Sequence, residues 1–124
     1  MTTNTIKVNV WGRELELKIV FDVYEGEDVL DNQNKALDLF LTQKELLNDY
    51  SKIKEYIENI DGDELQEDIT NIFKYVIPNT IFVKRNENSR IVALLCDYRF
   101  DEEGGIAALY ENERLVKIGT QDIV

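Results

Sequence analysis

The sequence predicts an α+β fold, in which an antiparallel sheet (N-terminal hairpin plus C-terminal strands) packs against two or three helices in the order ββ-ααα-ββββ. Alternation of apolar and polar residues near the N-terminus, helical spacing in the middle and short apolar runs from residue 80 onward support this class. With 124 residues, of which 44% are hydrophobic, the chain can bury one core. We therefore expect a single α+β domain over residues 1–124.

The N-terminal segment is expected to form a hairpin. Apolar and polar residues alternate on both sides of Gly12-Arg13, which can form a two-residue type II′ turn. Such a turn would pair Val10 with Leu15 and place the apolar side chains of both strands on one face. Trp11 would lie on the other face, either as a lid over neighbouring apolar surface or as an anchor for a partner.

Helical periodicity runs through the middle of the chain. Between residues 32 and 60 the apolar residues recur every three or four positions. This spacing predicts two helices with a break near Thr42, where Thr42 and Glu45 fit a capping box, or else one longer bent helix. Asp61-Gly62-Asp63 should end that segment, with a left-handed cap at the glycine, and a third helix is predicted over residues 63–75.

The last third of the chain is the most strand-like part. Residues 80–84 and 90–96 are expected to be strands. The second of them has apolar residues on both faces, as in a central strand that the helices cover on one side and that is partly covered on the other. Residues 104–110 and 114–118 follow as a hairpin. Cys96, the one cysteine, is expected to be a buried and unreactive thiol.

The charge balance limits the classes of partner. The chain has 14 Lys and Arg against 25 Asp and Glu, for a formal net charge of −11, which repels phosphate backbones and anionic lipids. We therefore expect no nucleic-acid and no membrane partner. The acidity favours either simple solubility or association with a basic protein. The N-terminus resembles no signal peptide, and no apolar run is long enough to span a membrane, so a cytoplasmic location is expected.

The lack of histidine limits the kinds of catalysis that are available to the chain. The chain has no histidine, which excludes Ser-His and Cys-His catalysis and His-based zinc sites. It also has no glycine-rich phosphate loop. We expect no enzymatic activity, no catalytic residue, no cofactor and no metal site.

Acidic residues gather in a turn that follows the strongest predicted strand. The members of this turn are Asp97, Asp101, Glu102 and Glu103. They could bind a divalent cation, serve acid–base catalysis from an apolar pocket, dock on Arg or Lys of a partner, or simply face water. Because their spacing is not that of a calcium-binding loop, and because adjacent turn residues are a poor acid–base pair, the last two interpretations are favoured.

Two C-terminal segments resemble a known family. The run Ala93-Leu-Leu-Cys-Asp-Tyr-Arg-Phe-Asp-Glu-Glu-Gly-Gly-Ile-Ala107 and the segment Leu115-Val-Lys-Ile-Gly-Thr-Gln-Asp-Ile123 are similar to the C-terminal signature of small acidic bacterial domains of unknown function. In that signature an aromatic-Asp-Glu-Glu turn precedes a glycine-containing strand, and a Gly-x-Gln-Asp-Ile segment closes the chain. In size and acidity these domains resemble immunity proteins, which protect bacteria from polymorphic or contact-dependent toxins.

The acidity, the lack of catalytic groups and this resemblance together predict an intracellular binding protein that neutralises a cognate toxin, such as a basic nuclease. We expect a monomer or weak homodimer. The residues expected to contact the toxin are Asp97, Tyr98, Asp101, Glu102, Glu103, Gln121 and Asp122. Gln121 and Asp122 could instead fix the C-terminal tail by hydrogen bonds to backbone groups. The alternatives are a small-ligand-binding or weakly enzymatic domain that uses the carboxylates, and a subunit that pairs through an exposed sheet edge.

Overall fold

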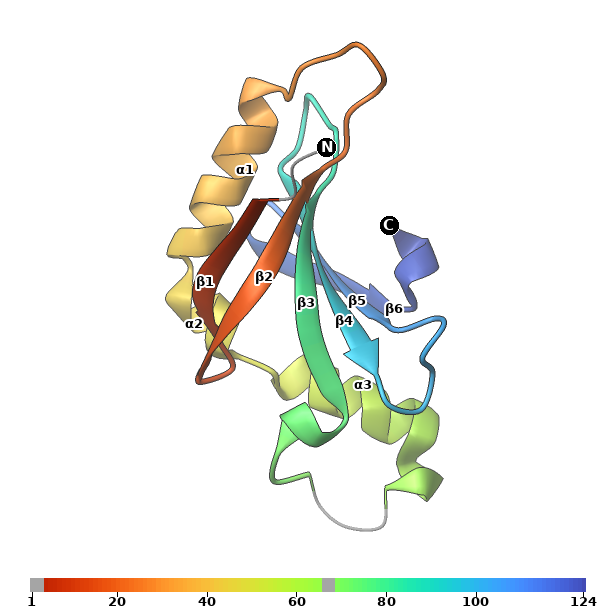
Figure 1. Cartoon of the computed structure of the whole chain (residues 1–124). Coiled ribbons are helices and arrows are strands. Elements are labelled where there is room, and N and C mark those ends of the chain that lie inside the picture. The colour runs from red at the N-terminus through yellow and green to blue at the C-terminus, as the bar shows by residue number, and fades with distance from the viewer. Residues whose placement is uncertain (1–3, 66–68) are drawn as a thin grey trace.

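The computed structural model describes residues 4–65 and 69–124 and confirms the α+β class (Figure 1). Six strands form one sheet in the order β1-β2-β3-β4-β5-β6. The elements are β1 (Asn4–Val10), β2 (Arg13–Phe21), α1 (Asp31–Thr42), α2 (Lys44–Asn48), α3 (Ser51–Asp61), the 3₁₀ turns η1 (Gly62–Glu64) and η2 (Ile72–Lys74), β3 (Val76–Val83), β4 (Ile91–Tyr98), β5 (Ile106–Glu111), β6 (Arg114–Gly119) and the 3₁₀ turn η3 (Gln121–Ile123).

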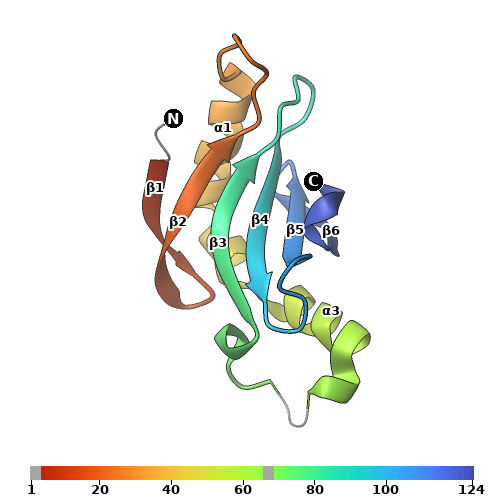
Figure 2. The ribbon, with the colours of Figure 1, turned by 45° about the vertical axis from the view of Figure 1, so that its right-hand side comes forward.

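The prediction of a wholly antiparallel sheet is wrong. β2 and β3 run parallel, with Ile19 opposite Ile81, whereas the other neighbouring pairs are antiparallel. A parallel pair needs a long crossover, and here the helical segment between β2 and β3 supplies it (Figure 2). Apolar alternation reports which side chains face the core but not the direction of the neighbouring strand, so the sequence pattern did not show this pairing.

The predicted register of the N-terminal hairpin is wrong by two residues. Trp11 and Gly12 form the turn, with φ angles of 54° and 80°, so that Val10 pairs with Arg13 and Val8 with Leu15. Positive φ at both central residues gives the turn a twist that matches the twist of the two flanking strands. Because a shift by an even number of residues keeps every side chain on its face, the predicted apolar face is preserved.

Trp11 is a core residue and no exposed anchor. Its side chain is 6% exposed and lies 6.2 Å from the ring of Tyr50 and 5.8 Å from that of Phe73, measured between centroids. Its backbone N–H donates to the carbonyl of Leu47 at 3.0 Å, and Asn48 Oδ1 accepts from the N–H of Gly12 at 2.8 Å. The hairpin turn is thereby docked on α2. Trp11 therefore packs in the same core as Val10 and Leu17, and its predicted place on the opposite face is wrong, although it covers apolar surface as a lid would.

The helical segment breaks at Thr42, as predicted, but not by the predicted cap. α1 ends at Thr42, whose hydroxyl donates to the carbonyl of Leu39 at 2.8 Å, and Gln43 is the N-cap of α2 without a side-chain cap. α3 ends at Asp61, and Gly62 follows with a right-handed φ of −54°, not with a left-handed cap. No helix in the described parts of the chain is long and apolar enough to cross a membrane.

The third helix predicted over residues 63–75 is wrong as well. The described residues of this stretch form only the short turns η1 and η2, and residues 66–68 lie outside the described part of the chain. Asn71 Oδ1 accepts from the N–H of Phe73 at 3.1 Å, which starts η2, and β3 already begins at Val76. The buried side chains of Ile69 and Ile72 contribute to the core from this irregular segment.

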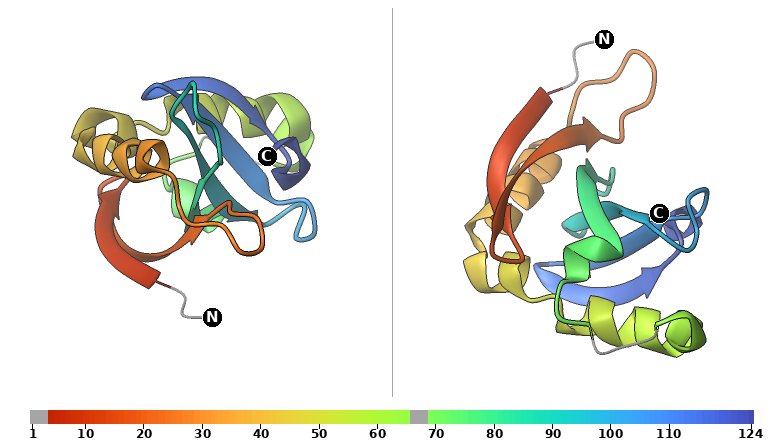
Figure 3. Two further views of the ribbon diagram at one scale, coloured as in Figure 1. Left: turned by 90° about the horizontal axis from the view of Figure 1, so that it is seen from above. Right: turned by 60° about the horizontal axis from the view of Figure 1, so that its bottom comes forward.

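The core lies between the sheet and the helices. Figure 3 shows the sheet curving around the helical layer, with α1 beside its middle strands and α3 alongside β6. The rings of Phe40 on α1 and Tyr110 on β5 lie 5.0 Å apart within this core. On the opposite face Ala93 is only 1% exposed whereas Asp97 is exposed, so this face of the central strand β4 is partly covered, as expected.

Cys96 is fully buried on the helix-facing side of β4. Burial raises the pKa of its thiol far above the ordinary value, and the charge of Asp97 raises it further. The predicted burial of the cysteine is confirmed. A thiol that stays protonated in an apolar core is a poor nucleophile, so we still expect it to be unreactive.

Candidate functional site

The predicted acidic turn forms a closed loop after β4. The carbonyl of Asp101 accepts from the N–H of Gly105 at 2.9 Å, and its side-chain Oδ1 accepts from the N–H of Gly104 at the same distance. Glu102 and Glu103 lie at the tip with exposed side chains. The loop therefore holds two carboxylates in water on a backbone that is fixed by internal hydrogen bonds.

The C-terminal segment is attached to this loop by a clamp that consists of Cys96, Gly104, Gly105 and Gln121. Gln121 donates from Nε2 to the carbonyl of Cys96 at 3.0 Å and from its backbone N–H to the carbonyl of Gly104 at 2.9 Å. Gly105 has a φ of 59°, and a Cβ there would lie 2.5 Å from Gln121 Nε2. The side chain of Gln121 is thus used to fix the C-terminal tail, as the alternative for this residue expected.

Tyr98 is an internal residue. It is 2% exposed, and its hydroxyl donates to Asp61 Oδ2 at 2.6 Å. Burial, followed by this hydrogen bond, raises the pKa of Tyr98. The pKa of Tyr56 on α3 is also raised, by burial and by the charges of Asp61, Asp101 and Asp122. Asp61 of α3, Asp101 of the loop and Asp122 of η3 therefore lie close enough to Tyr56 for their charges to act on its hydroxyl.

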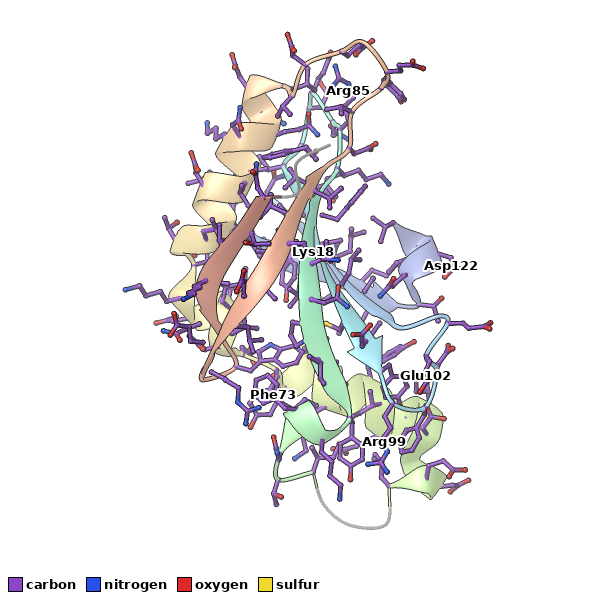
Figure 4. The ribbon with its side chains drawn as sticks, in the orientation of Figure 1. Lys18, Phe73, Arg85, Arg99, Glu102 and Asp122 are labelled. Carbon is purple, nitrogen blue, oxygen red and sulfur yellow. The ribbon has the colours of Figure 1, made fainter. Side chains whose placement is uncertain are left out.

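The predicted site residues divide into two groups. The side chains of five acids reach the surface: those of Asp97, Asp101, Glu102, Glu103 and Asp122. Asp122 accepts a hydrogen bond from the Thr120 hydroxyl within η3. We call these five residues the acidic end. Figure 4 shows Glu102 and Asp122 along the same side of the molecule, whereas Tyr98 and Gln121 make internal contacts.

A groove of about 370 Å³ opens beside the acidic end. Its lining combines predicted residues with others from the start of β3 and from the loop: Lys74, Tyr75, Ile77, Asp97, Tyr98, Arg99 and Glu102. The carbonyl of Tyr75 accepts from the N–H of Arg99 at 2.8 Å, which joins the two walls. Ile77 is 50% exposed, so the groove has an apolar wall as well as charges of both signs.

Sequence reasoning missed half of this groove. Lys74 and Tyr75 had been assigned to the end of a helix, so nothing placed them opposite β4. Arg99 lies within the acidic turn itself, and its positive charge was a usable signal that the surface has charges of both signs.

Among residues 4–65 and 69–124, no group of three or more Cys, Asp or Glu side chains is placed to hold a metal ion. The groove can therefore offer ion pairs, hydrogen bonds and an aromatic wall.

Comparison with curated proteins and with solved structures found no match. A family model described as a domain of unknown function, DUF6985, matches residues 2–124. This match spans both the helical middle and the acidic end, and its description assigns no activity. Since it covers almost the whole chain, the protein belongs to the DUF6985 family.

Proposed function

We propose that this domain is a protein-binding module whose acidic end docks on a basic surface of its partner. The observation that carries the proposal is the fixed loop with exposed Glu102 and Glu103 on a chain of net charge −11. A preformed charged surface accelerates encounter with an oppositely charged protein and suppresses wrong partners. Asp97 and Asp122 extend the same negative surface from β4 and η3.

In its sharpest form the proposal is that the domain is an immunity protein for a cognate bacterial toxin. Its support is the resemblance of the segments around Asp101 and Gln121 to the signature of small acidic bacterial domains, together with the acidity of the chain. A toxin that cleaves nucleic acid needs a basic groove for its own substrate. An acidic inhibitor is attracted to that groove and blocks it.

The test is co-expression with the product of the adjacent gene, scored as rescue of growth and as binding of the purified proteins. The diagnostic variant is Glu102→Lys with Glu103→Lys. Its matched control is Glu25→Lys with Glu87→Lys, which changes the net charge by the same amount at exposed positions in the loops after β2 and β3. Figure 4 shows Arg85, from the second of these loops, at the end of the sheet opposite Glu102. We expect the first variant to lower the association rate about tenfold or more at low salt.

Two results contradict this proposal. If both charge-reversal variants slow association equally, net charge and not the acidic end steers the encounter. If the adjacent gene product is neither toxic nor bound, the immunity function is wrong, and other basic proteins become the candidates for the partner. Rescue that is lost only in the Glu102 and Glu103 variant supports both the immunity function and the acidic end as its docking surface.

The groove beside the acidic end favours a second candidate function, which is binding of a small zwitterionic ligand. Its volume of about 370 Å³ lies within the range of small-molecule sites, and its lining presents Asp97 and Glu102 together with Arg99 and the ring of Tyr75. Free amino acids are suitable probes in a thermal-shift screen. Stabilisation that Asp97→Asn abolishes would support this candidate, and an unchanged melting temperature with every probe would remove it.

A further inference from the structure

The second region that the structure makes available for binding is an open edge of the sheet. The sheet ends at β6, which has β5 on one side and no described strand on the other. An edge strand directs alternate backbone N–H and C=O groups outward, where another strand can pair with them. Helix α3 lies alongside β6 in the right-hand view of Figure 3, so this edge is flanked by a helix.

A groove of about 370 Å³ runs between the edge and the helix. On one side it is lined by the four consecutive residues 115–118 of β6. The pairing with β5 shifts here, from Leu109 opposite Lys117 to Tyr110 opposite Leu115, so β6 bulges at Val116, and both Leu115 and Ile118 pack on the core. On the other side it is lined by Lys52, Glu55, Tyr56 and Asn59, which have the spacing of one helix face. Each wall is about 10 Å long.

The groove offers apolar surface as well as backbone groups. Leu115 and Ile118 are partly buried and pack on the core together with Tyr56. Val116 is 54% exposed, which is a large exposure for an apolar residue within a strand. The opposite edge of the sheet differs, because the exposed large apolar side chains include none from β1. Charge and bulges usually protect natural edges, and β6 has both, in Arg114, Lys117 and the bulge at Val116. Val116, exposed beside a groove, still indicates a contact surface, and the basic residues restrict it to acidic segments.

The charge of this region is opposite to that of the chain as a whole. β6 has the sequence RLVKIG, with two basic residues and no acidic one, in a protein of net charge −11. Across the groove Lys52 is paired with Glu55 of its own helix at 3.5 Å, which leaves Lys117 as the basic residue of the β6 wall. A segment that lies here with an acidic side chain beside Lys117 is electrostatically matched.

We propose that the β6 edge and α3 form a docking groove for an extended, acidic-apolar segment of a partner protein, which adds to the sheet as a further strand. Main-chain hydrogen bonds to β6 provide affinity in such strand addition, and pockets for alternate side chains provide specificity. Apolar side chains of the segment pack on Tyr56, Leu115 and Ile118, and an intervening acidic residue faces Lys117. None of the residues that line this groove belongs to the acidic end, so the inference does not depend on the function proposed above.

A second copy of this chain fits the groove less well than a foreign segment. Two copies of net charge −11 repel each other. An edge of six residues also buries much less than the roughly 1,200–2,000 Å² of a stable interface. Pairing of two β6 strands would in addition bring the basic residues Arg114 and Lys117 of both copies together.

The experiment uses peptides selected from a random linear library on the intact protein, followed by amide chemical-shift mapping and calorimetry with the synthetic peptide. We expect selected peptides to alternate apolar and acidic residues and to shift the resonances of residues 51–61 and 114–119. N-methylation of the peptide amides that face β6 should weaken binding about tenfold or more, whereas methylation of the intervening amides should not.

The variant Val116→Asp tests the groove from the side of the protein, with Lys7→Asp on the β1 edge as its control. Both side chains are exposed, so both variants should keep the far-ultraviolet spectrum of the parent. We expect binding to be lost only in Val116→Asp and to persist in the Glu102 and Glu103 variant. Failure to select any peptide, indifference to N-methylation, mapping to the acidic end, or a dimer that Val116→Asp dissociates would each overturn the proposal.

Discussion

Gly105→Ala is the substitution that most directly tests how the acidic loop is held. An L-residue at the observed φ of 59° costs about 1–2 kcal/mol. The added Cβ would also lie 2.7 Å from the carbonyl oxygen of Cys96, which belongs to the central strand, and 2.5 Å from Gln121 Nε2. Displacing Gln121 sacrifices its hydrogen bond to that carbonyl, worth about 1 kcal/mol. Together these effects should lower the free energy of unfolding by about 2–4 kcal/mol.

The matched control is Gly26→Ala. Gly26 has a φ of 80°, but nothing lies within 4 Å of the Cβ position, so this substitution introduces backbone strain alone. Urea denaturation followed by circular dichroism measures both variants. We expect Gly105→Ala to be the more destabilised by about 1–2 kcal/mol, and less than additively when combined with Gln121→Ala. Equal destabilisation of the two glycine variants, or full additivity with Gln121→Ala, would refute the clamp.

Further predictions concern the buried titratable groups. Tyr98→Phe removes the hydrogen bond to Asp61 and should cost about 1–2 kcal/mol in urea denaturation, whereas Tyr24→Phe, at a side chain that is 66% exposed, should cost almost nothing; equal losses would mean that this bond contributes little. The thiol of Cys96 should react with an aromatic disulfide reagent only as fast as the protein unfolds, and rapid labelling of the native protein would contradict its burial. Burial raises the pKa of Cys96 and Tyr110 in the folded state above the ordinary values of 9.0 and 10.0. The unfolded chain therefore loses these protons first. The free energy of unfolding that these two groups contribute should be constant up to about pH 9 and should fall as the pH rises further. A free energy of unfolding that rises with pH above this value would contradict the prediction.

The strands were the predictable part of the fold. Alternation identified the N-terminal hairpin and its buried face, and the two-faced apolar run identified β4 as central. The exact turn was not predictable, because Trp11 adopts a positive φ that bulky residues rarely take, and it does so where its side chain is buried between Tyr50 and Phe73. Tertiary packing of Trp11 determined the register of the hairpin, and the local sequence pattern carries no information about that packing.

The helical prediction failed where apolar spacing had two explanations. Apolar residues three or four positions apart also occur in an irregular segment whose side chains pack against the core at the end of a sheet, as those of Ile69 and Ile72 do. The same error moved Lys74 and Tyr75 away from the groove that they line. Clustering of acids in the sequence correctly found an exposed loop. Tyr98 was expected to contact a partner, but it continues the alternation of Leu94 and Cys96 and lies on the core side. The edge groove depends on where α3 lies, which no local signal specified.

The parallel pairing of β2 with β3 has a consequence for the order in which the protein folds. Strands β3 to β6 follow one another through short turns and can assemble early, because little chain entropy is lost in closing each turn. Ile19 reaches Ile81 only after the whole helical crossover has been closed into a loop. We expect the N-terminal hairpin to join the nucleus late. Until it does, the edge of β3 is exposed, so a nascent or transiently opened molecule is most vulnerable to strand exchange at the middle of its final sheet and not at its borders.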